Sequence, residues 1–197
     1  MKIGIFFLSI SILALAGKTL SCPAPLIKEI SYGGKGCSKK AEGAKIKASF
    51  QDIDVVFKNF KVGHSVSLKK RLHRKSCQIV VSLDVPKGYH VSFGDLNLKG
   101  EKNVVKGSSL DFRMEAFFSG DTEAKLQKKW DSGSKDPFKL EYKGAHKSWS
   151  SCGQDVNVRF SLSLMLRSKK VKGKIPPAFG QLRSLKGKNW LLVKPCS

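Results

Sequence analysis

Acidic side chains are scarce in this sequence. Its 197 residues include 15 Asp and Glu against 37 Lys and Arg, which gives a formal net charge of +22. After Asp155 no acidic residue occurs, whereas ten Lys and Arg follow it. A field of this sign attracts polyanions such as nucleic acid, acidic polysaccharide, lipopolysaccharide or anionic lipid headgroups. The competing interpretation is a protein whose basic charge is incidental.

Long apolar runs are equally rare, and the one clear example lies at the N-terminus. Residues 3–16 read "IGIFFLSISILALA", after the positively charged Met1-Lys2 and with a small-x-small pattern at Ala14-Leu15-Ala16. The run is shorter than the ~20 residues that a membrane-spanning helix needs. It therefore predicts a signal peptide over residues 1–16, cleaved after about Ala16. The alternative is a lipoprotein signal, with Cys22 as the lipidated residue.

Export sets the expected compartment and its redox chemistry. No second apolar run follows, so we expect no transmembrane segment after cleavage, and removal of Lys2 leaves a charge of +21. The expected location is secreted, or periplasmic in the cell envelope, where disulfides are stable. The sequence leaves the oligomeric state open.

No stretch keeps a helical period, and alternation of apolar and polar residues dominates instead. Such alternation is typical of half-buried strands, and it occurs in residues 45–50, 52–60, 77–85, 89–98, 110–118, 138–142, 156–166 and 190–193. Short alternating runs separated by Gly and Pro turns predict an all-β fold, an antiparallel β-sandwich. We expect one such domain over residues 30–197, preceded by an N-terminal mature segment, residues 17–29. Ser168 to Lys188, with its lysines and Pro176-Pro177, is expected to be a long surface loop.

The stretch "SYGGKGCSKK", residues 31–40, allows three interpretations. A phosphate-binding loop needs G-x-x-x-x-G-K-[ST] between a strand and a helix, and this pattern is missing. A zinc site needs a second Cys or His close to Cys37, and none lies within several residues. Glycines also serve where a chain turns tightly beside a covalent bridge. We therefore interpret the stretch as a corner tied by a disulfide.

The motifs around four cysteines resemble a known family. In order, they are "ISYGGKGC", "KSCQIVVSLDVPKGYHVSF", "FFSG", "WSSCGQDVNVRFSLSL" and "WLLVKPC". Together they resemble the Domain of Unknown Function 4360 family, secreted cysteine-containing proteins of fungi and bacteria, from about Ile30 to Cys196. The resemblance implies a framework of Cys37, Cys77, Cys152 and Cys196 that leaves Cys22 outside, and it implies no particular activity.

This chain departs from the family pattern in two ways, and its pairing of cysteines stays open. Family members usually continue the first motif with Gly-Cys-Pro, whereas Ser38 follows Cys37 here, and they are not strongly basic. Four cysteines allow three pairings. We favour Cys37–Cys77 and Cys152–Cys196, each of which closes a loop of about 40 residues and contributes roughly 4 kcal/mol.

No catalytic or metal-binding motif emerges, so we expect a non-enzymatic protein without a cofactor. The histidines are separate from one another and from paired cysteines, at positions His64, His73, His90 and His146. "GHSVS", residues 63–67, only approaches the nucleophile elbow G-x-S-x-G and lacks its α/β setting. Asp52 and Asp54 share a strand face and keep a glycan hydrolase as a less favoured alternative.

Basic residues in connections form the candidate binding site. They fall into two clusters, and the contacts we favour are Lys69, Lys70, Arg71, Lys169, Lys170, Lys172 and Lys174. Surface loops are accessible to large partners, so an anionic polymer or envelope surface is the expected partner. Trp149 and Trp190 are expected in the core, while Trp130, among lysines, could stack on a ligand. The alternative is a structural cell-surface or envelope protein.

Overall fold

The computed structural model describes residues 23–64, 71–118, 121–144 and 149–196. These residues form thirteen strands, β1 to β13, and one 3-10 helix, Lys39–Ala41. The predicted signal peptide and Cys22 lie outside the described residues. No helix in the described part of the chain is long and apolar enough to cross a membrane.

The first sheet has five antiparallel strands in the order β1-β5-β11-β8-β9. Their bounds are β1 Leu26–Gly33, β5 Leu72–Asp84, β11 Val156–Ser168, β8 Ser108–Phe118 and β9 Asp121–Trp130. Residues predicted as strands at 77–85, 110–118 and 156–166 thus make its three central strands. The sheet already starts at Leu26, inside the segment that was expected to precede the domain.

The second sheet has six antiparallel strands. Five follow the order β10-β7-β12-β3-β2, and β4 pairs with β12 beside them. The bounds are β10 Ser134–Tyr142, β7 Leu96–Val104, β12 Ala178–Lys188, β3 Asp52–Phe57, β2 Ala44–Ala48 and β4 Lys61–His64.

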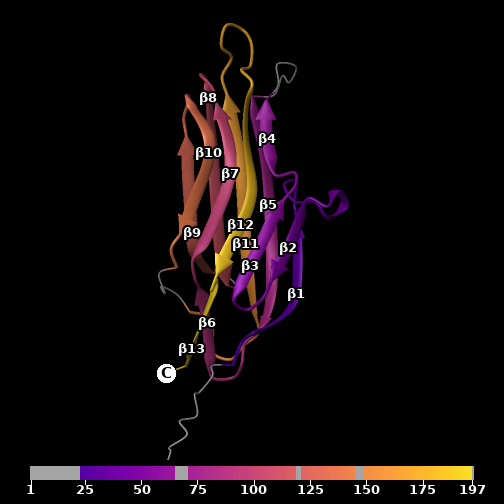
Figure 1. The fold of residues 1–197 in the computed structure, drawn as a ribbon, viewed down its shortest axis with the longest axis vertical. Helices are drawn as coiled ribbons and strands as arrows, with labels where there is room; N and C mark the ends of the chain where they lie inside the picture. Colours follow the sequence, from indigo (N-terminus) through magenta and orange to yellow (C-terminus); the bar gives the residue numbers. More distant parts are fainter. Residues whose placement is uncertain (1–22, 65–70, 119–120, 145–148, 197) are drawn as a thin grey trace, which may run out of the picture.

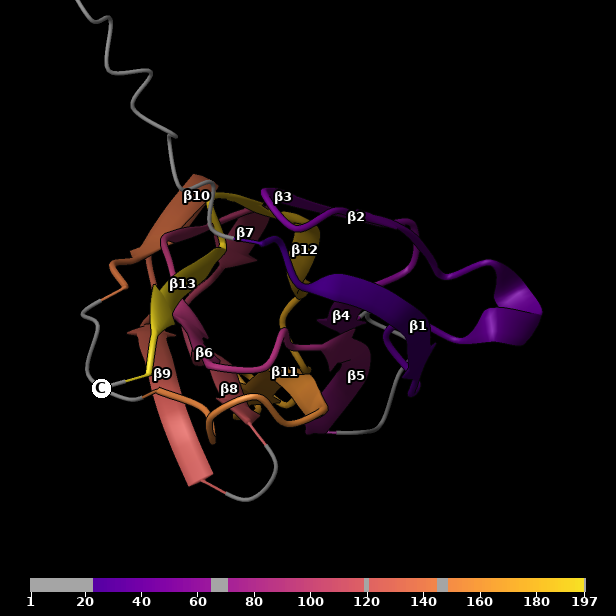
Figure 2. The ribbon, with the colours of Figure 1, turned by 90° about the horizontal axis from the view of Figure 1, so that it is seen from below.

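The two sheets lie on opposite sides of the molecule in the end view of Figure 2. One hydrophobic core fills the space between them. Alternating residues of each strand point inward, since successive side chains of a strand leave on opposite faces. Ile79, Phe112 and Phe160 of the first sheet and Leu98 and Leu185 of the second have no exposed surface. The predicted all-β sandwich is therefore confirmed.

A two-stranded ribbon closes the lower end of the sandwich in Figure 1. It consists of β6, Tyr89–Phe93, and β13, Leu191–Pro195. Both disulfides have the pairing that we favoured. Cys37–Cys77 ties the β1–β2 connection to β5, and Cys152–Cys196 ties the segment before β11 to the residue after β13.

The expectation of a long surface loop from Ser168 to Lys188 was wrong, because its second half is β12. This strand lies between β7 and β3 in the six-stranded sheet. Its register shifts between Leu182 and Ser184, which breaks the alternating pattern. One inward position is also Gly180, where a side chain would collide with Leu110 of β8. The strand thus lacks the regular apolar face by which β5, β8 and β11 could be predicted.

The glycine-rich corner before Cys37 is explained by crowding around the disulfide. Gly34 has a φ of +123°, and a side chain there would collide with the Ser76 carbonyl oxygen. At Gly36, a Cβ would lie 2.6 Å from the ring of Phe60. The amide of Gly36 donates to Ser76 O at 2.8 Å, which holds the corner against β5. This geometry confirms the interpretation as a disulfide corner.

Candidate anion-binding site

Two basic segments that are almost a hundred residues apart in the sequence meet at the upper end of the sandwich in Figure 1. The amide of Ser168, the last residue of β11, donates to the carbonyl oxygen of Arg71, which precedes β5, at 2.9 Å. The next amide, that of Lys169, donates to Gly107 O at 2.7 Å in the β7–β8 turn. The structure therefore brings Arg71 and Lys169 of the predicted clusters to one place. Lys69 and Lys70 lie outside the described residues.

Arg71 and Lys169 line a hollow of about 590 Å³, together with the neighbouring strand ends. Two more cations and several hydroxyl groups complete it, and the polar lining residues are Arg71, Ser108, Ser109, Lys129, Asp131, Ser132, Arg167, Ser168 and Lys169. Four cations thus face one carboxylate, which lies 3.2 Å from the Lys129 ammonium. Such a hollow favours an anion that also accepts hydrogen bonds from hydroxyl groups.

Arg167 differs from the other cations of the hollow because a buried partner holds it. Its Nη1 donates to Asp111 Oδ2 at 2.7 Å, and the Asp111 side chain is only 7% exposed. The two residues sit on the same outer face, Arg167 on β11 and Asp111 on the paired β8. The guanidinium is thereby oriented at the rim of the hollow, while its own side chain stays 53% exposed.

The remaining predicted cations lie on the connection between β11 and β12, which rises beyond the sheets in Figure 1. Lys169, Lys170, Lys172 and Lys174 are all exposed. Two backbone hydrogen bonds between Val171 and Lys174, of 2.8 and 3.1 Å, close a tight turn. Lys172 and Gly173 have positive φ angles in it, as the two central residues of a type I′ turn do. The lysines are therefore presented on a formed turn.

Sequence reasoning missed Lys129 and Arg167 as parts of this site. Both lie on alternating strands, where a basic residue on the solvent face gives no signal of its own. Their meeting with Arg71 follows from the pairing of β11 with both β5 and β8 and of β8 with β9. A sequence without known pairing partners does not contain that information.

Asp52 and Asp54, the residues of the hydrolase alternative, lie on the outer face of the six-stranded sheet. They line a second hollow, of about 680 Å³, with Asp95 and several lysines. Lys186, on the paired strand β12, donates to Asp54 at 2.7 Å. This ion pair gives Asp54 a structural partner and accounts for one lysine of the second basic cluster without a ligand.

The three tryptophans have different surroundings. Trp190 is fully buried, so the core expectation is confirmed for it. Trp149 is only partly buried, and the Lys194 ammonium lies 4.3 Å from its ring centre. The Trp130 ring packs on the ring of Phe138, with the two ring centres 4.7 Å apart. The Lys102 ammonium lies 5.8 Å from the centre of the Trp130 ring. Trp130 therefore completes the core at the edge between β9 and β10.

Replacement of Arg167 and of Lys169 by alanine is expected to change the free energy of unfolding by different amounts. R167A leaves a buried carboxylate without its arginine and will lower the free energy of unfolding by about 1–3 kcal/mol. K169A touches an exposed side chain and will change it by less than about 0.5 kcal/mol. Urea unfolding of both variants measures the difference. D111A/R167A serves as the reference, because it removes both partners of the ion pair and leaves no buried carboxylate unpaired. Equal effects of R167A and K169A would contradict the role given to Asp111.

The sequence of this chain is similar to known proteins. A family model described as "Domain of unknown function (DUF4360)" matches residues 24–182. An uncharacterized secreted protein of Arthroderma benhamiae is 25% identical over 151 residues, which cover 73% of this chain. The chain spans 61% of the length of that relative.

Two solved structures are similar to this chain at low TM-scores. The adhesin domain of Epf from Streptococcus pyogenes is 12% identical, with a TM-score of 0.26. The match covers 74% of this chain and 47% of the adhesin chain. A family 11 carbohydrate-binding module from Clostridium thermocellum is 10% identical, with a TM-score of 0.25. The match covers 85% of this chain and 97% of the module. TM-scores this low carry no argument about fold or function.

Proposed function

The chain belongs to the DUF4360 family, a domain of unknown function, and from this premise we propose that it is an exported, non-enzymatic protein that binds anionic polymers or anionic envelope surfaces. Export is supported by the N-terminal signal pattern, by two disulfides and by the secreted relative. The binding surface is the basic end, defined as Arg71, Lys129, Arg167, Lys169, Lys170, Lys172 and Lys174.

One observation carries the proposal. Basic residues from β9, β11 and the segments before β5 and after β11 converge on one end, around a hollow of about 590 Å³. Incidental charge would be spread over the solvent faces, where each cation is separately hydrated. A converging set instead gives one polyanion several simultaneous contacts, and each contact releases condensed counterions. The mechanism is electrostatic, with the hydroxyls of Ser109 and Ser132 as additional donors. The hydroxyls of Ser108 and Ser168 are buried and bond to each other at 2.7 Å.

Salt dependence is the first test. The purified protein should bind duplex DNA, a sulfated glycan, lipopolysaccharide or anionic vesicles, and not a neutral glycan. If four cations contact phosphates, affinity for duplex DNA should fall roughly 100-fold between 50 and 200 mM salt. One polyanion that is retained at physiological salt would be the specific ligand. Equal release of all polyanions would favour the structural protein with incidental charge.

A charge-reversal variant locates the surface. K169E/K170E/K172E/K174E should abolish most binding and flatten the salt dependence, because it removes the contacts of the β11–β12 turn. The matched control K35E/K40E/K45E/K47E changes the net charge equally, on exposed lysines of the β1–β2 region. Binding isotherms at 100 mM salt compare the two. If both variants bind equally weakly, the net charge and not the basic end attracts the ligand.

A further inference from the structure

His90 lies beside the second disulfide, at the end of the molecule that carries the β6–β13 ribbon. In the register of this ribbon, His90 of β6 stands opposite Lys194 of β13. Cys196 follows Lys194 by two residues and therefore leaves the ribbon on the same side as Lys194. The Cys196 amide donates to Gly88 O at 2.7 Å, which continues the ribbon to this cysteine. His90 and Cys196 thus share one side of the ribbon.

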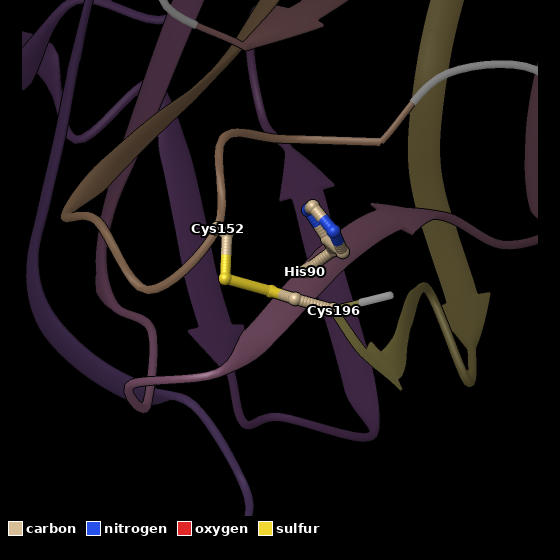
Figure 3. Close-up of side chains that lie close together, drawn as sticks. All are labelled: His90, Cys152 and Cys196. Carbon is tan, nitrogen blue, oxygen red and sulfur yellow. A yellow bond between two sulfur atoms is a disulfide. The ribbon is translucent and has the colours of Figure 1, made fainter.

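The segment with Cys152 runs along the other edge of β6. Ser150 N donates to Val91 O and Gly153 N to Tyr89 O, both at 2.9 Å, and Val91 N donates to Ser150 Oγ at 3.1 Å. These bonds place Cys152 next to His90. One ring nitrogen of His90 and the two sulfur atoms all lie within 4.8 Å of one another, and Figure 3 shows the ring beside the disulfide.

A backbone contact orients the imidazole and determines which nitrogen carries the hydrogen. His90 Nδ1 lies 2.6 Å from Ser150 O. A carbonyl oxygen only accepts, so Nδ1 donates this bond, and in the neutral ring Nε2 keeps its lone pair. Metal-ligating histidines commonly donate their second ring N–H to a backbone carbonyl in this way. His90 Nε2 therefore keeps the free lone pair that a metal ligand needs, in a ring that lies beside the two sulfur atoms.

We propose that reduction of the Cys152–Cys196 disulfide creates a zinc site made of both cysteine sulfurs and His90 Nε2. A dithiol reductant transfers two electrons and two protons, leaves as a cyclic disulfide and converts each cysteine to a thiol. Zn²⁺ then binds with the release of the two thiol protons. Three protein ligands and a water fulfil the tetrahedral preference of zinc.

Reduction lets the three ligand atoms adopt the spacing that such an ion needs. Zn–S bonds of about 2.3 Å at a tetrahedral angle place the two sulfurs roughly 3.7 Å apart, so the sulfurs must separate from their bonded distance once the disulfide is reduced. A ring nitrogen of His90 already lies within 4.8 Å of both sulfurs. The backbone hydrogen bonds on both edges of β6 do not depend on the disulfide. They hold both cysteines near His90 after the covalent bond is cut.

Accessibility makes the reduction selective. Cys152 is exposed and Cys196 half-buried, whereas Cys37 and Cys77 are both fully buried. Thiol–disulfide exchange needs the attacking thiolate to reach a sulfur. A dithiol under native conditions should therefore open Cys152–Cys196 and leave Cys37–Cys77 intact. The buried bridge serves as an internal control in the same molecule.

Cobalt titration of the reduced protein tests the site. The full chain with C22S, so that no further thiol is present, is treated with a dithiol under native conditions and freed of reductant without oxygen. Thiol counting should give two per chain. Co²⁺ should then produce a thiolate-to-metal charge-transfer band with one ion per chain, and Zn²⁺ should displace it. The oxidised C22S protein should give no such band.

The histidine contribution has its own control. H90Q should weaken the affinity of the reduced protein for Zn²⁺ at least about 10-fold, and H73Q, at a partly buried histidine of β5, should leave it unchanged. Both variants retain all four framework cysteines, so they can fold with both bridges in place before the dithiol opens Cys152–Cys196. The proposal is overturned by unchanged affinity in H90Q, by Co²⁺ binding without a thiolate band, or by earlier reduction of Cys37–Cys77.

Discussion

W190A is expected to lower the free energy of unfolding by about 4 kcal/mol, as is typical for truncation of a large buried aromatic residue. Trp190 is the largest side chain that is fully buried in the described part of the chain. Its ring centre lies 5.8 Å from that of Phe160 of β11, so it joins the β12–β13 connection to the opposite sheet. Alanine would leave a cavity that the rigid strands around it can only partly close. Urea unfolding with an unchanged m-value measures the loss.

The backbone around Trp190 shows why the site cannot easily collapse. Trp190 N donates to Gln51 O at 3.2 Å, and its carbonyl oxygen accepts from Gly94 N at 2.8 Å. Gly187 leaves the space that the tryptophan fills, since a Cβ there would lie 2.7 Å from the Trp190 Cβ. These contacts fix the position of the residue from both sides. A cavity at this point therefore stays open, and the loss is expected in the upper range for such variants.

W190F separates the hydrogen bond of the indole from its volume. Trp190 Nε1 donates to Ser49 O at 2.8 Å, and phenylalanine keeps an aromatic ring but loses this donor. Leaving the carbonyl without its partner, in a slightly underfilled space, should cost about 1–2 kcal/mol. The order wild type, W190F, W190A should hold in thermal unfolding as well. A W190F variant as unstable as W190A would mean that the hydrogen bond outweighs packing.

The central strands were predictable because their environment is regular. β5, β8 and β11 face the core with one side and solvent with the other. Apolar and polar residues therefore alternate with a period of two along their sequences. β12 was not predictable by this rule, since its register shift and Gly180 interrupt the apolar face. The packing of Leu110 into the space above Gly180 is a property of the opposite sheet, which the local sequence does not contain.

The candidate sites show the same division between local and non-local information. The exposed lysines of the β11–β12 turn were predictable, because a basic run between strands is a local feature. Their meeting with Arg71 and Arg167 depends on which strands pair. His90 was judged isolated because its neighbours in sequence are not ligands, and only the pairing of β6 with β13 brings Cys196 to it. Spacing rules for metal ligands fail where the ligands are joined by tertiary structure.

C37A/C77A is the second variant with a large expected effect, a loss of about 4 kcal/mol from loop entropy alone. The bridge closes a loop of 40 residues, and its removal gives the unfolded chain that freedom back. Both cysteines are fully buried, so alanines also leave a small void that should cost about 1 kcal/mol more. Without the bridge, the hydrogen bond from Gly36 N to Ser76 O still joins the glycine-rich corner to β5.

The matched comparison is C152A/C196A, both double variants being made in a C22S background to prevent exchange. Its bridge has a sequence separation of 44, so the entropic loss is again about 4 kcal/mol. Cys152 is exposed, however, and no comparable void forms. Urea unfolding should therefore rank C37A/C77A as the less stable of the two by about 1 kcal/mol. The loop entropies of the two bridges are nearly equal, so the burial of the cysteines is the remaining difference. The reverse order of stability would therefore show that the Cys152–Cys196 bridge at the ribbon end contributes more to stability than the buried Cys37–Cys77 bridge.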